Sequence, residues 1–210
     1  MKKKLPLISF VFSILFISIS YSQDDDVTFN RFDVTATTGI GYGQVKNDNE
    51  PNYNLSANVG EVLLTYNFNS NFGISAGAGW LQLSGNGFNS SGNFYHERDL
   101  LKFPLLVRSS QKLTDKINLL LSAGFYGQTI INDEFRFLST IEEDVYEGWT
   151  FGFQGFFGFE YDVSNNWSLG INVSTQSDFN KLKTENNTSF QDEQSIQTLN
   201  TIGLLFGYRF

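Results

Sequence analysis

Bulky apolar residues alternate with small or polar ones in several parts of this chain, most clearly in the last nine residues. From Ile202 to Phe210 every second residue is apolar, and Gly203, Gly207 and Arg209 lie between them. Successive side chains of a strand point to opposite faces, so this segment predicts a strand with one apolar face. At an open sheet edge such a strand promotes aggregation, whereas in a closed membrane barrel its apolar face contacts lipid. The C-terminal pattern therefore favours a transmembrane β-barrel.

The same alternation predicts eight strands along the chain. Connections after the second, fourth and sixth segments are short, and the others are longer and rich in Asn, Ser, Gly, Asp and Glu. An even number of strands with this alternation of loop lengths is typical of outer-membrane barrels. We therefore expect an all-β, eight-stranded antiparallel transmembrane β-barrel with short periplasmic turns, longer extracellular loops and both termini in the periplasm. The expected segments are approximately 32–45, 54–68, 72–85, 94–109, 117–131, 147–163, 167–179 and 195–210.

A soluble lipocalin-like barrel is the alternative, with its apolar residues inside. The polar face of the segments is rich in glycine, as at Gly41, Gly77 and Gly152. Eight strands enclose a space only just wide enough for side chains, so small residues fit inside and aromatic residues belong outside. Aromatic side chains are then expected at the two membrane boundaries. Those expected near the periplasm are Phe32, Phe68, Phe72, Tyr161, Trp167 and Tyr208, and those near the outer boundary are Trp80 and Trp149.

The N-terminus predicts a cleaved secretory signal peptide over residues 1–22. Three lysines precede an apolar run over 5–19, and small residues at Ser20 and Ser22 place the cleavage before Gln23. The alternative is a membrane anchor, for which the run is short. Residues 23–31 are then a short periplasmic segment and 32–210 the barrel.

Loss of the three lysines of the signal peptide moves the formal charge from −8 to −11, which disfavours nucleic-acid binding. The absence of cysteine excludes disulfides and thiolate metal sites.

Charged residues on the face expected to line the lumen form the first candidate site. Burying a charge requires a partner or water, so we expect a structural network of ion pairs in the lumen. A narrow gated pore lined by the same groups is the alternative. We also expect Asp33 to pair with Arg209 across the seam between the first and last strands, and Pro104 to mark a bulge. The candidate residues are Asp33, Glu61, Lys102, Arg108, Glu160, Asp162 and Arg209.

The single histidine, His96, is the second candidate, because it lies near Glu97 and Asp99 at the expected extracellular rim. A histidine beside carboxylates can act as a base. No enzyme motif surrounds it, so a solvated rim histidine is favoured over catalysis. Carboxylates at 133, 134 and 142–144 lack the alternating pattern of a Ca²⁺ loop and predict a solvated acidic loop. We expect no enzyme activity, cofactor or metal.

Three features resemble the small outer-membrane β-barrel family of Bacteroidota, also called PorT-like or porin-family proteins. They are Ser22-Gln23, the stretch Leu101-Lys102-Phe103-Pro104-Leu105-Leu106-Val107, and the aromatic last strand. The resemblance implies outer-membrane lipid as the surroundings and insertion by the barrel-assembly machinery, which would recognise Phe206, Tyr208 and Phe210. It supplies no activity. We expect a structural, loop-display or envelope-assembly role, including that of a secretion accessory with an envelope protein partner. The alternatives are a narrow channel and, less favoured, a surface lipid- or peptide-modifying enzyme.

Overall fold

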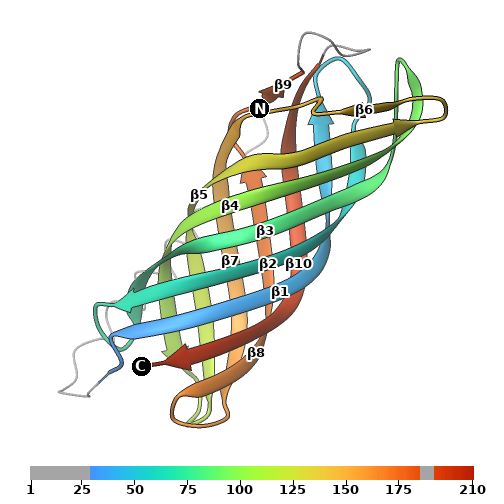
Figure 1. The fold of residues 1–210 in the computed structure, drawn as a ribbon. Helices are drawn as coiled ribbons and strands as arrows, with labels where there is room; N and C mark the ends of the chain where they lie inside the picture. The colour runs from blue at the N-terminus through green and yellow to red at the C-terminus, as the bar shows by residue number, and fades with distance from the viewer. Residues whose placement is uncertain (1–28, 185–191) are drawn as a thin grey trace, which may run out of the picture.

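The computed structural model describes residues 29–184 and 192–210, which form one closed antiparallel sheet (Figure 1). Neighbouring strands follow one another around the ring, and β1 closes it by pairing with β10. The expected all-β, eight-stranded antiparallel barrel is confirmed. Among the described residues, no helix is long and apolar enough to cross a membrane. The eight long strands are β1 (Phe32–Asn47), β2 (Tyr53–Asn67), β3 (Phe72–Asn89), β4 (Gly92–Lys112), β5 (Ile117–Phe137), β7 (Trp149–Asp162), β8 (Trp167–Asp178) and β10 (Glu193–Arg209).

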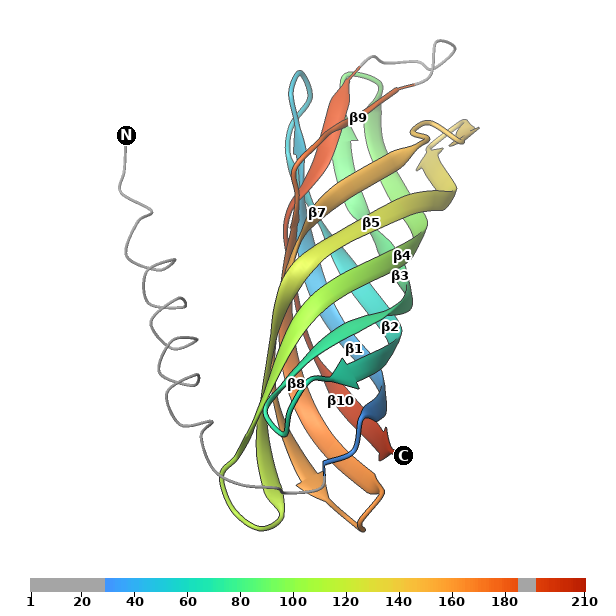
Figure 2. The same cartoon turned by 90° about the vertical axis from the view of Figure 1, so that its left-hand side faces the viewer.

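Two short strands extend the barrel at its extracellular end. β6 (Ile141–Glu143) pairs with the end of β5, and β9 (Leu182–Lys183) pairs with the start of β10. An isolated bridge between Tyr146 and Thr184 connects the segments that carry them. Both additions lie at the end of the barrel opposite the C-terminus (Figures 1 and 2). The predicted signal peptide and residues 23–28 of the segment 23–31 lie outside the described residues.

Several strands are longer at the extracellular end than the sequence predicts. The connection between β3 and β4 is only 90–91, and β5 continues to Phe137. Asp133 and Glu134, predicted in a solvated acidic loop, therefore lie within β5. The added residues pair in register, as between Glu97 and Glu134, so backbone hydrogen bonds extend the barrel well above the apolar belt.

An apolar belt surrounds the periplasmic half of the barrel. Exposed side chains on its outer face include Leu64, Phe153 and Ile171, whereas the inner face carries polar residues. The outward orientation of the apolar face is therefore confirmed. At the periplasmic boundary, the ring centroids of Trp167 and Tyr208 lie 4.8 Å apart. Such amphipathic rings suit a membrane–water interface.

The two faces exchange their polarity further along the strands. On β2 the exposed apolar residues include Val62 and Leu64, but nearer the extracellular end the apolar residues Leu55 and Ala57 point inward and are buried. Inward apolar residues at this end also come from β1, β3, β4, β5, β9 and β10, which makes the extracellular part resemble a soluble barrel with its own core. This core, termed here the extracellular core, consists of Val45, Tyr53, Leu55, Ala57, Leu81, Leu83, Phe94, Leu100, Phe135, Val145, Tyr146, Leu182, Ile196 and Leu199.

Glycine permits a close approach of strands at the seam between β1 and β10. A Cβ atom on Gly41 would lie 2.0 Å from the carbonyl oxygen of Asn200, and one on Gly203 would lie 2.1 Å from that of Thr38. Real Cβ atoms do not approach so closely, so any larger residue would push the two strands apart. The glycines on these strands therefore allow the barrel to close.

Candidate functional site

The predicted luminal charges lie on the inner side of the barrel, and those nearest the periplasm form an ion-pair triad. Arg209 contacts Glu160 at 2.8 Å and Asp162 at 2.7 Å. The hydroxyl of Ser168 donates a hydrogen bond to Glu160. A Cβ on Gly207 would lie 2.4 Å from the Glu160 carboxylate, so glycine leaves the space that this carboxylate fills. The triad occupies the periplasmic mouth of the lumen.

Arg108 forms the next polar layer. Its Nη1 donates hydrogen bonds to the hydroxyl oxygens of Thr35, at 2.9 Å, and Thr65, at 3.2 Å. Thr65 also shares a hydrogen bond of 2.8 Å with Ser75. All four side chains are buried, so this guanidinium crosses the lumen instead of reaching water.

A buried ion pair between Lys102 and Glu61 lies in the middle of the lumen, with 2.7 Å between Nζ and Oε2. Lys102 also donates to the side-chain oxygens of Gln154 and Gln176, at 3.1 and 3.2 Å. Gln154 in turn donates to Glu61. A polar cavity of about 10 Å³ adjoins this pair, which suffices for about one water molecule. The layer therefore joins four strands and leaves little open space.

A buried hydrogen-bond network lies higher, within the extracellular core. His96 bonds through Nδ1 to the Tyr53 hydroxyl at 2.9 Å and through Nε2 to Asp133 at 2.8 Å. Arg98 donates to the same carboxylate at 2.7 Å, and the Tyr146 backbone N–H donates to its other oxygen at 3.0 Å. Asp133 thus fastens the segment before β7 onto the core.

Charge and burial determine the protonation of this network, which lies beyond the apolar belt. Burial and the nearby Arg98 guanidinium lower the pKa of His96 to about 4. Burial opposes ionisation of Asp133, but Arg98 and His96 outweigh it and lower the pKa of this carboxyl to about 2. At neutral pH the network therefore holds a neutral imidazole beside an Arg98–Asp133 ion pair.

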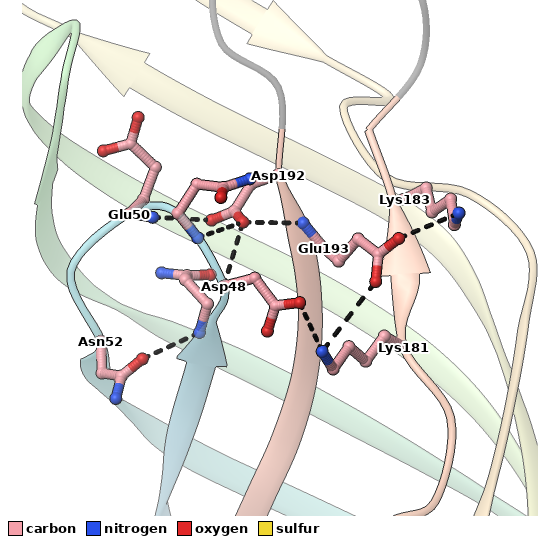
Figure 3. Close-up of polar contacts among 9 residues, drawn as sticks. Asp48, Glu50, Asn52, Lys181, Lys183, Asp192 and Glu193 are labelled. Carbon is pink, nitrogen blue, oxygen red and sulfur yellow. Dashed lines mark hydrogen bonds and ion pairs between the residues drawn. The ribbon is translucent and has the colours of Figure 1, made fainter.

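A second polar cluster joins the loop between β1 and β2 to the seam at β9 and β10 (Figure 3). The Asp192 carboxylate accepts backbone hydrogen bonds from Asp48, Asn49 and Glu50, at 3.1, 2.9 and 3.3 Å. Lys181 contacts the Asp48 carboxylate at 2.5 Å. Three successive N–H groups around one carboxylate fix the loop to β10, so this part of the rim has a defined shape.

The structure corrects two predictions about the lumen. Asp33 and Arg209 are paired through their backbones, but their side chains do not form the predicted ion pair. Arg209 instead contacts carboxylates of β7, and Asp33 accepts a hydrogen bond of 2.9 Å from Asn67. Pro104 points inward without a bulge, because the register shifts between Asp99 and Leu100. Proximity along the seam therefore did not determine side-chain pairing.

The structure also corrects the predicted environment of His96. Its side chain is fully buried instead of solvated, and its acidic partner is Asp133 on the neighbouring strand. Glu97 and Asp99 alternate with His96 along β4 and point to the outer face. Within 29–184 and 192–210, no group of three His, Cys, Asp or Glu residues could hold a metal ion.

The three predicted assembly residues lie on the outer face of the last strand and beyond it. Phe206 and Phe210 are exposed, and Tyr208 contacts Phe210 with ring centroids 5.0 Å apart. They continue the apolar belt at the periplasmic boundary, and their role in assembly stays a prediction.

Comparison with known proteins identifies the family. A model of the outer membrane protein beta-barrel domain matches residues 11–210. The chain belongs to this family. Its location is therefore the outer membrane, in agreement with the apolar belt. No curated protein matches its sequence significantly.

Solved structures of other outer-membrane proteins share the fold of this family member. Neisserial surface protein A is 11% identical, with 85% of this chain and 97% of that chain covered and a TM-score of 0.53. OprG from Pseudomonas aeruginosa is 13% identical, with 88% and 100% covered and a TM-score of 0.52. A major outer membrane protein from Thermus thermophilus is 10% identical, with 84% and 99% covered and a TM-score of 0.51. At these identities the similarity establishes the fold alone.

Proposed function

We propose that this outer-membrane barrel is a non-conducting protein with a structural or interaction role, presenting its extracellular rim at the cell surface. The filled lumen is the observation that carries this proposal. Three polar layers, centred on Arg209, Arg108 and the Lys102–Glu61 pair, follow one another from the periplasmic end. The extracellular core then fills the outer part of the barrel. A continuous water path would require both regions to rearrange.

Opening such a path has a high energetic cost. Opening the path would separate Lys102 from Glu61 and leave each charge in a narrow space without its partner. Removing one partner of a buried ion pair costs about 3–5 kcal/mol, which sets the scale of this cost. Exposing the extracellular core adds the loss of well-packed apolar contacts, such as those of Leu55 and Leu83. These costs favour a closed barrel over the alternative of a narrow gated channel.

Conductance measurements test this proposal directly. Full-length mature protein, folded into planar bilayers, is expected to give no unitary current steps in KCl. The Lys102→Met variant is the matched probe, because it changes the charge of the layer that any ion would pass. Reproducible wild-type steps whose cation–anion selectivity changes in Lys102→Met would establish a channel and refute the proposal.

The buried state of His96 supports a role without catalysis. The extracellular core covers its side chain, and both ring nitrogens already have partners in Tyr53 and Asp133. A surface lipid- or peptide-modifying reaction needs a base that reaches its substrate. If wild-type cells modified such a substrate and cells with His96→Gln did not, while keeping equal amounts of folded barrel, this inference would fail.

The finer assignment is a PorT-like barrel of the Bacteroidota type that supports an envelope assembly such as a secretion apparatus. The Leu101–Val107 stretch and the aromatic last strand support it. Purification of tagged protein from gently solubilised native outer membrane tests this role. A stoichiometric envelope partner is expected, and its absence under conditions that preserve known membrane complexes would leave a stand-alone barrel. Insertion by the barrel-assembly machinery through Phe206, Tyr208 and Phe210 is part of the same proposal.

A further inference from the structure

The outer face of β4–β6 above the apolar belt carries two aligned rows of side chains. The register places Glu97 beside Glu134 and Glu134 beside Glu143. In the next row, Tyr95 lies beside Arg136 and Arg136 beside Ile141. Neighbouring strands lie about 4.8 Å apart, so each row forms a short continuous band. These six residues, together with Leu138 at the hairpin tip, are termed here the acidic face.

Apolar side chains of the acidic face are unusually open to water for a position outside the membrane. Leu138 is fully exposed, and Ile141 is 61% exposed. Both belong to the hairpin formed by β5 and β6, which projects from the upper end of the barrel (Figure 1). Elsewhere in this part of β4 and β5, apolar residues such as Phe94 and Phe135 point into the extracellular core. The hairpin therefore exposes aliphatic surface that the fold does not use.

The charge of the acidic face is unbalanced. Arg136 contacts both Glu134 and Glu97, and its guanidinium lies 5.9 Å from the centre of the Tyr95 ring. Within the described part of the chain, Glu143 has no ion-pair partner. One cation thus serves three carboxylates beside two exposed aliphatic side chains.

We propose that the acidic face docks a cationic polypeptide segment that carries aliphatic side chains. This proposal rests on the interaction role proposed above for the extracellular rim. Lysine or arginine of the partner would lie over Glu134 and Glu143, while an aliphatic side chain would contact Ile141 and Leu138. A second copy of this chain would bring the same excess of carboxylates and be repelled. An anionic glycolipid would be repelled in the same way unless divalent cations intervened.

Binding of defined peptides to the full mature barrel in phosphatidylcholine nanodiscs tests the docking proposal. The probe is a ten-residue alternating Lys-Leu peptide, compared with a Lys-Ser peptide of equal charge and with empty nanodiscs. The variants are Glu134→Gln/Glu143→Gln and Leu138→Ser/Ile141→Ser. All four residues are on the outer surface, so the extracellular core stays intact. The control Asp115→Asn/Glu147→Gln removes the same charge elsewhere, from a periplasmic turn and from the segment before β7.

Wild-type barrel is expected to bind the Lys-Leu peptide more tightly than the Lys-Ser peptide. The Kd should rise by about threefold to tenfold in each test variant, because two exposed contacts are lost, and stay unchanged in the control. Equal binding of both peptides, or equal loss in the control, would overturn the proposal. Calcium-dependent binding of lipopolysaccharide, or dimerisation, abolished by Glu134→Gln/Glu143→Gln without any selective peptide binding would also overturn it. Conductance is measured separately. A closed barrel that binds neither peptide selectively would refute the docking proposal alone, whereas a conducting barrel would refute the proposed function.

Discussion

Acidification is expected to destabilise the barrel through His96, the only histidine in the chain. The pKa of this side chain is lowered from 6.5 to about 4 in the fold, first by burial and then by Arg98. Between these two values the unfolded chain binds a proton that the folded barrel does not, so stability falls as the pH falls. At pH 5 the loss relative to pH 8 is about 2 kcal/mol, or about 30-fold in the folding equilibrium. Asp133, with a pKa of about 2, stays ionised throughout this range.

Urea unfolding in phosphatidylcholine vesicles, followed by tryptophan emission, measures this effect at pH 8 and pH 5. The His96→Gln variant keeps a polar side chain near Tyr53 and Asp133 but cannot titrate. Subtracting its pH dependence from that of the wild type removes the contribution of groups that titrate alike in both proteins. The reasoning is refuted if the two proteins lose the same free energy between pH 8 and pH 5. That result would mean that His96 is protonated as readily in the fold as in water.

Three further predictions concern the lumen, the seam and the rim. Lys102→Met should reduce the free energy of unfolding by about 3–5 kcal/mol by leaving Glu61 unpaired, whereas Glu61→Gln/Lys102→Met should cost much less; the reverse order in urea unfolding would contradict this. Gly41→Ala should lower the thermal midpoint by several degrees, because its Cβ would contact a carbonyl of β10, while Gly60→Ala, with open space around its Cβ, should not. Asp192→Ala should speed amide hydrogen exchange in the loop between β1 and β2, and unchanged exchange there would show that the carboxylate does not hold the loop.

The sequence predicted the membrane-embedded half of the barrel well, because one rule governs it. Outward residues such as Leu64 and Phe153 contact lipid, so alternation shows both the strand and its face. Residues that alternate with outward apolar residues along a strand, such as Lys102 and Glu61, could be assigned to the lumen for that reason. Their mutual pairing could not be predicted, since it depends on strand stagger and side-chain length. Arg209 illustrates this, because it passes its backbone neighbour Asp33 and reaches Glu160 on another strand.

The extracellular half was less predictable because the same alternation continues there with its faces exchanged. On β3 the regular run of outward apolar residues stops at Trp80, with only Phe88 exposed beyond it, and the inward apolar residues Leu81 and Leu83 follow Trp80 directly. Two consecutive bulky residues conceal the change when a single apolar face is assumed. His96 was assigned to a solvated rim for the same reason, and its partner Asp133 was assigned to a loop. A search for the position on each strand where the apolar residues move from the outer to the inner face would have indicated that His96 and Asp133 lie inside the barrel.

This exchange of polarity marks the height at which the surroundings of the barrel change from lipid to water. Below it, lipid contacts apolar residues, so the lumen must hold the polar side chains and satisfies them through ion pairs such as that of Lys102 and Glu61. Above it, water contacts the outer face, so apolar residues can fill the interior. A conduit would need an open polar lining at both levels. At the upper level the inward polar residues, such as His96 and Asp133, are buried and bonded to one another within the apolar core. The pattern of the strands thus assigns the lumen to stability, and it leaves the outer surface of the rim as the part on which the proposed docking depends.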